Sequence, residues 1–440
     1  MQVVSFVIVA IIAVLGRAVE RRWTNLLTFF SGMWAIVILL SSLRLFGLVE
    51  IDEFVYTIIL IGNISFVTGY LLYGTIWNRR QLFAYGAGPV NDLDMNRFRA
   101  KAFHPKTKKI LWVLLAVTLI YYAYNSLVSL RLLLAGKDFI AIRNINQGYA
   151  DIQLESSGFM HMIRDYVANP CIALIIPAML ISMFLKKVDV PFIVLSLLAV
   201  GAYIFSTGGR ISLVYIIIDL VFLARASKIR IPGKIKKWIK RGVVAAIVLI
   251  AFLTYFRTRR SDGTGIIGSI YRYLVLSMPL LDYHVKSIQL SGDMFYGMAF
   301  FLGLIKIIYI VFNRVGLSMP RLFHNTLSAM TLTESTWVRA FPAHKNNAFV
   351  TMFYYFYADF RLLGVILGSF VFGYFCCWSY KRMLKKGSIE ALFFFLMVVQ
   401  VVSKSFVRWE FSSLPFDLAV LYYLIGFILV PRVRLKSGRR

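Results

Sequence analysis

Long apolar runs separated by short polar segments dominate the pattern of this chain. Many runs are about 15 to 24 residues long, close to the ~20 residues that a helix needs to cross a bilayer. They lack the alternation of polar and apolar residues that is typical of a transmembrane barrel. The pattern therefore predicts an all-α polytopic membrane protein with about 11 transmembrane helices. The runs expected to span are 3–15, 26–43, 54–77, 110–130, 171–185, 190–205, 211–224, 243–256, a run ending near 380, 391–402 and 418–430.

The composition agrees with this class. Hydrophobic residues make up 59% of the chain and the mean hydropathy is +0.73, well beyond an ordinary soluble domain. Cys171, Cys376 and Cys377 lie in apolar runs without the spacing of metal ligands, and no His-Glu-x-x-His motif occurs. We therefore expect packing cysteines, no metal and no cofactor.

The charge is strongly basic and unevenly distributed. The formal net charge is +29, which in a soluble chain would suggest nucleic-acid binding. Here six alternate loops hold 30 of the 49 Lys and Arg residues but only five of the 20 Asp and Glu residues. The positive-inside rule makes these loops cytoplasmic, with the N-terminus outside and the C-terminus inside, so a nucleic-acid partner is not needed to explain the charge. The loops are 17–22, 78–109, 186–189, 225–242, 381–390 and 431–440.

One long segment, 257–347, does not have the pattern of a membrane span followed by a short loop. On this topology it lies on the outer side, after eight spans in 1–256 and before the last three spans and the basic tail in 348–440. Within it, 294–312 is apolar enough to span, but a span there would move the later basic loops to the outer side. We therefore predict a helix in the outer interface or tucked into the bundle, within one integral membrane domain.

Arginines occur at the predicted outer face, where the positive-inside rule does not require them. Arg210 follows a Gly-Gly turn that permits close approach of a ligand, and the planar guanidinium suits phosphate oxygens. Arg257 and Arg260 are three residues apart and share one face if the preceding span continues as a helix. The alternatives are an interfacial arginine that reaches toward lipid headgroups and a charged helix cap.

Two groups could act as a general base. Glu410 follows Arg408-Trp409 directly after a span, and His344 lies near the end of the large loop. A local salt bridge at Glu410 and a merely solvated His344 remain alternatives. Asp359 could pair with Arg361 or with a basic residue of the site. Asp219, well inside its span, is a structural partner or has no assigned role.

Several short motifs follow one another in a characteristic order. They are the Gly-Gly-Arg210 turn, Tyr255-Phe-Arg-Thr-Arg-Arg260, Asn347-Ala-Phe-Val-Thr, Tyr357-Ala-Asp-Phe, Leu363-Gly-Val-Ile-Leu-Gly368 and Arg408-Trp-Glu410. In order and topology the chain resembles the bacterial oligosaccharide repeat-unit polymerases of O-antigen and capsule synthesis (Wzy-type). Where that family usually has Asp-Phe-Gly, this chain has Asp359-Phe-Arg361, which leaves the role of Arg361 open.

The resemblance implies a GT-C-like membrane fold and a glycosyltransferase. Two undecaprenyl-pyrophosphate-linked glycans would meet at the outer face of a bacterial plasma (inner) membrane, and polymerisation would release polyprenyl pyrophosphate. His344 or Glu410 would be the base. The bilayer, a flippase and a chain-length regulator are the further partners it implies. The residues it implies for binding pyrophosphate or substrate are Arg210, Arg257, Arg260, Arg272, Arg339, Asp359 and Arg408.

Two other functions remain alternatives. A polysaccharide ligase has the same membrane architecture and differs in its acceptor. A lipid-linked oligosaccharide flippase would favour internal repeats, broken helices and polar residues near the middle of the membrane. The polar residues of this chain gather mainly at one face, with Asp219 as the main exception.

Overall fold

The computed structural model describes residues 1–85, 102–137, 142, 158–185, 187–209, 211–226, 241–242, 244, 248, 265–342 and 344–429. These residues are helical apart from loops and one two-stranded antiparallel hairpin. Six of the described helices are long and apolar enough to cross a membrane, which indicates a multi-pass membrane protein. They are α1 (Gln2–Glu20), α3 (Glu53–Tyr85), α5 (Pro105–Leu134), the continuous segment Gly158–Phe184, α9 (Val190–Thr207) and α16 (Thr351–Lys386).

The remaining apolar runs are helices of 16 or 17 residues, or a short α-helix continued by a π-helix. The expected run 243–256 lies outside the described residues except for 244 and 248. The others form α2 (Leu26–Ser42), α10 (Ile211–Ala226), α17 (Ile389–Lys404), and α18 (Leu414–Tyr423) with η4 (Leu424–Leu429). The segment Gly158–Phe184 is likewise composite, with α7 (Gly158–Ile163), the π-helix η2 (Arg164–Ala168) and α8 (Asn169–Phe184).

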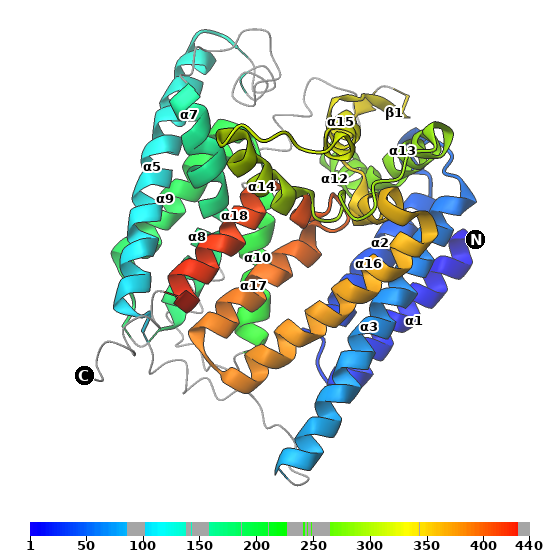
Figure 1. The fold of residues 1–440 in the computed structure, drawn as a ribbon, viewed down its shortest axis with the longest axis horizontal. Coiled ribbons are helices and arrows are strands. Elements are labelled where there is room, and N and C mark those ends of the chain that lie inside the picture. Colours follow the sequence, from blue (N-terminus) through cyan, green and yellow to red (C-terminus); the bar gives the residue numbers. More distant parts are fainter. Residues whose placement is uncertain are drawn as a thin grey trace. The chain divides into compact units, whose positions relative to one another are not determined.

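Chain contacts divide the protein into two compact units. The first comprises Met1–Asn91, Ser261–Lys385 and Val401–Leu414, and the second comprises Asp92–Arg260, Lys386–Gln400 and Pro415–Arg440. In the first unit, most helices of the large loop lie together at one end of α1, α2, α3 and α16 (Figure 1). These are α12 (Gly265–Val275), α13 (Ser277–Ser291) and α15 (Arg321–Ser335), with the hairpin of β1 (Val338–Phe341) and β2 (His344–Asn346).

The core of the first unit depends on close approach of α3 and α16. A Cβ at Gly69 would lie 2.0 Å from the carbonyl oxygen of Phe370, and a Cβ at Gly373 would lie 2.0 Å from that of Phe66. The two backbones therefore touch at both positions, as small residues allow between membrane helices. Phe66 also stacks on Phe30 of α2, with ring centroids 4.0 Å apart.

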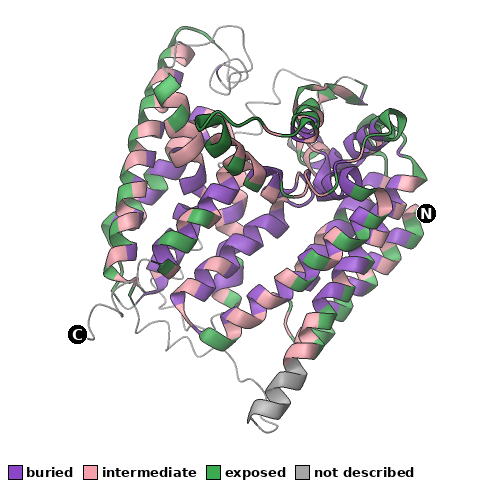
Figure 2. Ribbon diagram, in the orientation of Figure 1, coloured by how far each residue is buried: buried purple, intermediate pink, exposed green. Residues whose placement is uncertain are grey.

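The second unit buries α8 and exposes one face of α5 (Figure 2). Val113, Ile120, Leu127 and Leu134 are 56–80% exposed and recur every seven residues along α5. That spacing places them on one face of the helix, where lipid would cover them in a membrane. Inside the unit, Gln400 Nε2 donates to Asp219 Oδ2 at 2.8 Å, which supplies the structural partner considered for Asp219.

The run 294–312 is not one continuous helix. Residues 296–301 form turns, and α14 (Leu302–Arg314) follows with 13 residues, or roughly 20 Å at ~1.5 Å per residue. That length is short of the ~30 Å hydrocarbon core. Leu304, Ile308 and Val311 on α14 are exposed.

Candidate functional site

The residues after α17 are held against the start of α16. Met352 N donates to the carbonyl oxygen of Ser405 at 2.8 Å, and Thr351 N donates to that of Val407 at 3.1 Å. These backbone hydrogen bonds hold the loop that carries Arg408 at the beginning of α16, in the first unit.

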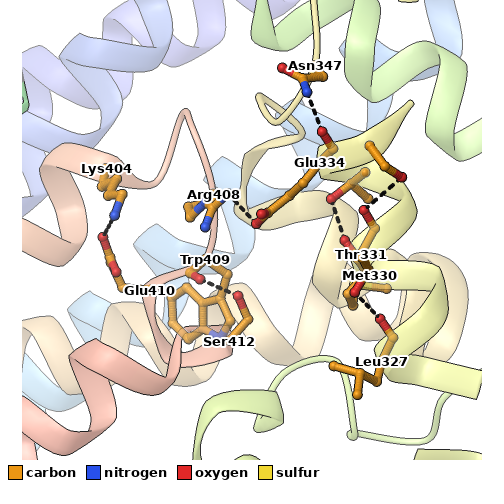
Figure 3. Close-up of polar contacts among 12 residues, drawn as sticks. Leu327, Met330, Thr331, Glu334, Asn347, Lys404, Arg408, Trp409, Glu410 and Ser412 are labelled. Carbon is orange, nitrogen blue, oxygen red and sulfur yellow. Dashed lines mark hydrogen bonds and ion pairs between the residues drawn. The ribbon is translucent and has the colours of Figure 1, made fainter. Parts of the chain in front are cut away.

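Arg408 forms an ion pair with a residue of the large loop. Its guanidinium lies 2.6 Å from Glu334 Oε1 at the end of α15 (Figure 3). Ala348 N donates to the carbonyl oxygen of Thr333 at 2.9 Å. The side-chain amide of Asn347 donates to the backbone carbonyl oxygen of Glu334. The end of the large loop is therefore fastened to α15 beside the ion pair.

A second ion pair lies beside the first. Lys404 Nζ contacts Glu410 Oε1, and the Glu410 side chain is 6% exposed (Figure 3). Lys306 of α14 interacts electrostatically with both Glu334 and Arg408. We call Lys306, Glu334, Lys404, Arg408 and Glu410 the charged cluster. It holds three cations and two carboxylates, so its formal charge is +1.

The surroundings shift the protonation of two cations in opposite directions. Burial works most strongly against the charge of Arg408, but the combined attraction of Glu334, Tyr355 and Glu410 raises the pKa of Arg408 above its ordinary value. Burial lowers the pKa of Lys306, and attraction by Glu334 only partly offsets that effect. Arg408 is therefore a permanent cation, whereas Lys306 holds its proton less firmly.

Trp409 and Asp359 fix the turn that leads into α14. Trp409 is 1% exposed, and its Nε1 donates to the carbonyl oxygen of Phe300 at 2.9 Å. The Asp359 carboxylate accepts from Ala299 N at 2.9 Å and from Phe300 N at 2.8 Å. The described partners of this carboxylate are thus backbone amides, whereas the sequence suggested Arg361 or another basic residue. This arrangement fixes the turn before α14, the helix that carries Lys306.

The helix α16 is interrupted directly after Asp359. Phe360 and Arg361 have non-helical backbone angles, and Arg361 has φ 56° and ψ −139°, where a side chain is strained. The Arg361 guanidinium donates to the carbonyl oxygen of Ile288 at 3.0 Å and lies over the Tyr357 ring at 5.5 Å. Arg361 therefore ties the break in α16 to α13.

Asp282 and His284 of α13 have different partners. Asp282 pairs with Lys286, with Oδ1 and Nζ 2.9 Å apart, while His284 is buried with its ring centroid 5.6 Å from that of Tyr354. Burial lowers the pKa of His284 to about 4, so this imidazole is neutral near pH 7.

The structure describes the predicted site residues unevenly. Arg210, Arg257 and Arg260 lie outside the described residues. Ahead of Arg210, Gly208 ends α9 in the left-handed region with φ 64°, as the predicted tight turn requires. The others lie in the first unit: Arg272 on α12, Arg339 on β1 opposite Lys345, His344 on β2 opposite Phe341, Asp359 on α16, and Arg408 and Glu410 after α17.

Sequence reasoning did not assign a role to three members of the charged cluster. Glu334 was one polar residue among many in the large loop, and Lys306 interrupts an apolar run. Lys404 precedes Arg408 by four residues, a spacing that could have drawn attention to it.

The three cysteines are buried, consistent with packing. Among the described residues, no group of three or more His, Cys, Asp or Glu side chains lies together as metal ligands would.

No protein-family model, no curated protein and no solved structure matches this chain.

Proposed function

We propose that this protein is a glycosyltransferase that polymerises polyprenyl-pyrophosphate-linked oligosaccharide repeat units at the outer face of a bacterial plasma membrane. The observation that carries the proposal is the charged cluster, in which a half-buried arginine, two lysines and two carboxylates meet at the start of α16. Its cations suit a pyrophosphate leaving group, and its carboxylates can orient cations or take a proton.

The position of the charged cluster along α16 supports its location at the outer face of the membrane. The far end of α16 carries Lys381, which pairs with Glu20 at 2.8 Å, and Arg382, which lies over the Trp378 ring at 5.0 Å. Lys385 lies over the Trp77 ring at 5.2 Å. Tryptophan is typical of either membrane interface, and a cluster of basic residues is typical of the cytoplasmic one. The roughly 36 Å of α16 after its break is enough to carry the chain from one interface to the other. The finer topology, with eleven spans, an outside N-terminus and a GT-C-like arrangement, is part of this proposal.

The reaction would be a displacement at a sugar carbon. A hydroxyl oxygen of the incoming repeat unit forms a bond to the anomeric carbon of the growing chain, and the bond from that carbon to the pyrophosphate oxygen breaks. The hydroxyl proton passes to Glu410 or His344, and the electron pair leaves with polyprenyl pyrophosphate. Arg408, held by Glu334, and Lys306 would stabilise that developing charge. Arg210, Arg257, Arg260, Arg272 and Arg339 remain proposed contributors.

The backbone at Arg361 supports the resemblance to repeat-unit polymerases. Their Asp-Phe-Gly motif has glycine at the position of Arg361, and the φ of 56° found here lies in the region that favours glycine. The chain therefore keeps the backbone turn that such a motif would form while replacing its glycine.

Reconstitution tests the proposal. Purified protein is supplied with its lipid-pyrophosphate-linked repeat unit, without nucleotide sugar or metal, and the products are resolved on a gel. We expect a ladder that Arg408→Ala weakens by roughly 10- to 100-fold, since a charge-assisted hydrogen bond contributes ~1.5–3 kcal/mol. Arg408→Lys should retain part of the activity because it keeps the charge but loses the planar fork.

Two controls separate lost chemistry from lost folding. Arg314 is exposed on α14 outside the charged cluster, so Arg314→Ala should leave the ladder unchanged. The double variant Glu334→Gln/Arg408→Met removes both charges of the ion pair and so leaves no buried charge without its partner. It should therefore fold and remain inactive. Full activity of well-folded Arg408→Ala protein would contradict the proposed site.

A transporter is the second candidate, because one observation in the second unit favours it. Asp219 is 0% exposed, and neither its Oδ1 nor the Oε1 of Gln400 has a partner among the described residues. Acids buried within membrane spans often serve transport. Movement of the lipid-linked unit across liposomes, without a ladder, would favour a flippase. Transfer onto a different lipid acceptor would favour a ligase.

A further inference from the structure

A cavity opens in the second unit where three helices end or begin. Its volume is ≈ 210 Å³, and its lining comes from the start of α5, the end of α8 and the start of α9. The loops 78–109 and 186–189, which the charge count assigns to one face, therefore contribute to a single cavity. The residues that matter here are Phe103, Lys108, Leu111, Lys187, Asp189 and Phe192.

The polar groups of this cavity leave one cation uncompensated. Lys108 Nζ lies 2.7 Å from Asp189 Oδ2, so these two charges balance. Asp189 also caps α9 by accepting from Phe192 N at 3.3 Å. Lys187 is exposed and adds a positive charge. The net formal charge of the three groups is +1. An anionic ligand would have to compete with Asp189 for contact with Lys108.

The other walls are apolar and well supported. Phe192 packs edge-on against Trp112 with ring centroids 5.5 Å apart, and Phe103 packs against Phe427 at 6.1 Å. Thr107 Oγ1 donates to the carbonyl oxygen of Gly426 at 2.7 Å, which ties the start of α5 to η4. A charged rim over apolar walls matches a molecule with an anionic head and a hydrocarbon tail. The volume is below the 300–1,000 Å³ typical of pockets for whole drug-sized ligands, so it suits a headgroup.

We propose that this cavity binds the phosphate headgroup of an anionic phospholipid. Basic pockets between membrane helices on the cytoplasmic side commonly hold such headgroups. Lys187 and, after partial release from Asp189, Lys108 contact the phosphate, while Phe103, Leu111 and Phe192 line the path of the glycerol and the first acyl carbons. The residues that line this cavity are not among those proposed for the polymerase site, so lipid binding can be tested separately from polymerisation.

The test compares lipids and three variants of the full-length protein. Binding of phosphatidylglycerol and of phosphatidylcholine is measured by native mass spectrometry in detergent. We expect retention of phosphatidylglycerol in preference to phosphatidylcholine, and a loss of about fivefold in Lys187→Ala, as expected for one lysine near an anionic headgroup. Lys137 is exposed at the other end of α5, so Lys137→Ala should bind like the parent protein.

Asp189→Asn provides a test of opposite sign. Asparagine still caps the helix, so α9 should remain intact, while Lys108 is freed and phosphatidylglycerol should bind more tightly. Equal retention of the two lipids, or equal effects of Lys187→Ala and Lys137→Ala, would overturn the proposal. Competition by soluble glycerol phosphate as effective as that by phosphatidylglycerol would overturn the lipid assignment, because the apolar walls would then contribute nothing.

Discussion

Arg361 combines an unfavourable backbone conformation with a useful side chain. Its φ of 56° favours glycine, while its guanidinium bonds to the carbonyl oxygen of Ile288. Arg361→Gly loses the hydrogen bond but relaxes the backbone, whereas Arg361→Ala loses the bond and keeps the strain. We expect the alanine variant to be less stable than the glycine variant by ~1–2 kcal/mol. Chemical denaturation in detergent measures this difference, and an alanine variant as stable as the glycine variant would refute the strain.

At the scale of helices, contact between α3 and α16 depends on two glycines. A side chain at Gly69 or Gly373 would collide with backbone carbonyl oxygens, which cannot move aside as a flexible side chain can. We expect Gly69→Ala to lower the thermal midpoint strongly, since overpacking typically costs ~1–3 kcal/mol or more. Gly74→Ala on the same helix meets only Cys377 Sγ at 3.8 Å and should be nearly neutral. Similar midpoints for the two variants would exclude the predicted backbone contact.

At the scale of the whole molecule, the proposed orientation assigns the two ends of α16 to opposite sides of the membrane. Ser318, between α14 and α15, should face outward, and Lys385, near the end of α16, should face the cytoplasm. The native cysteines are buried, so Ser318→Cys and Lys385→Cys can be probed in their presence. An impermeant maleimide applied to intact spheroplasts should label only Ser318→Cys, and Lys385→Cys should react after permeabilisation. The reverse pattern would invert the topology.

The candidate site could be predicted only in part. Arg408 and Glu410 stand out in the sequence because the positive-inside rule does not require an arginine at the predicted outer face, and the structure places both residues in the charged cluster. Their partners could not be found in that way, because Glu334 is 74 residues from Arg408. Asp359 likewise binds amides 59 and 60 residues away, and backbone donors carry no sequence signal. A carboxylate held by amides and one held by arginine look the same in a sequence.

The sequence by itself determined where the long apolar helices lie and which loops are rich in basic residues. Both follow from local properties, since a run of apolar residues must satisfy its backbone within a helix and cationic loops resist translocation. The tertiary structure alone decided which charges meet in the charged cluster, where α16 breaks and how closely α3 approaches it. Those outcomes depend on contacts between distant segments, whose geometry no local pattern specifies.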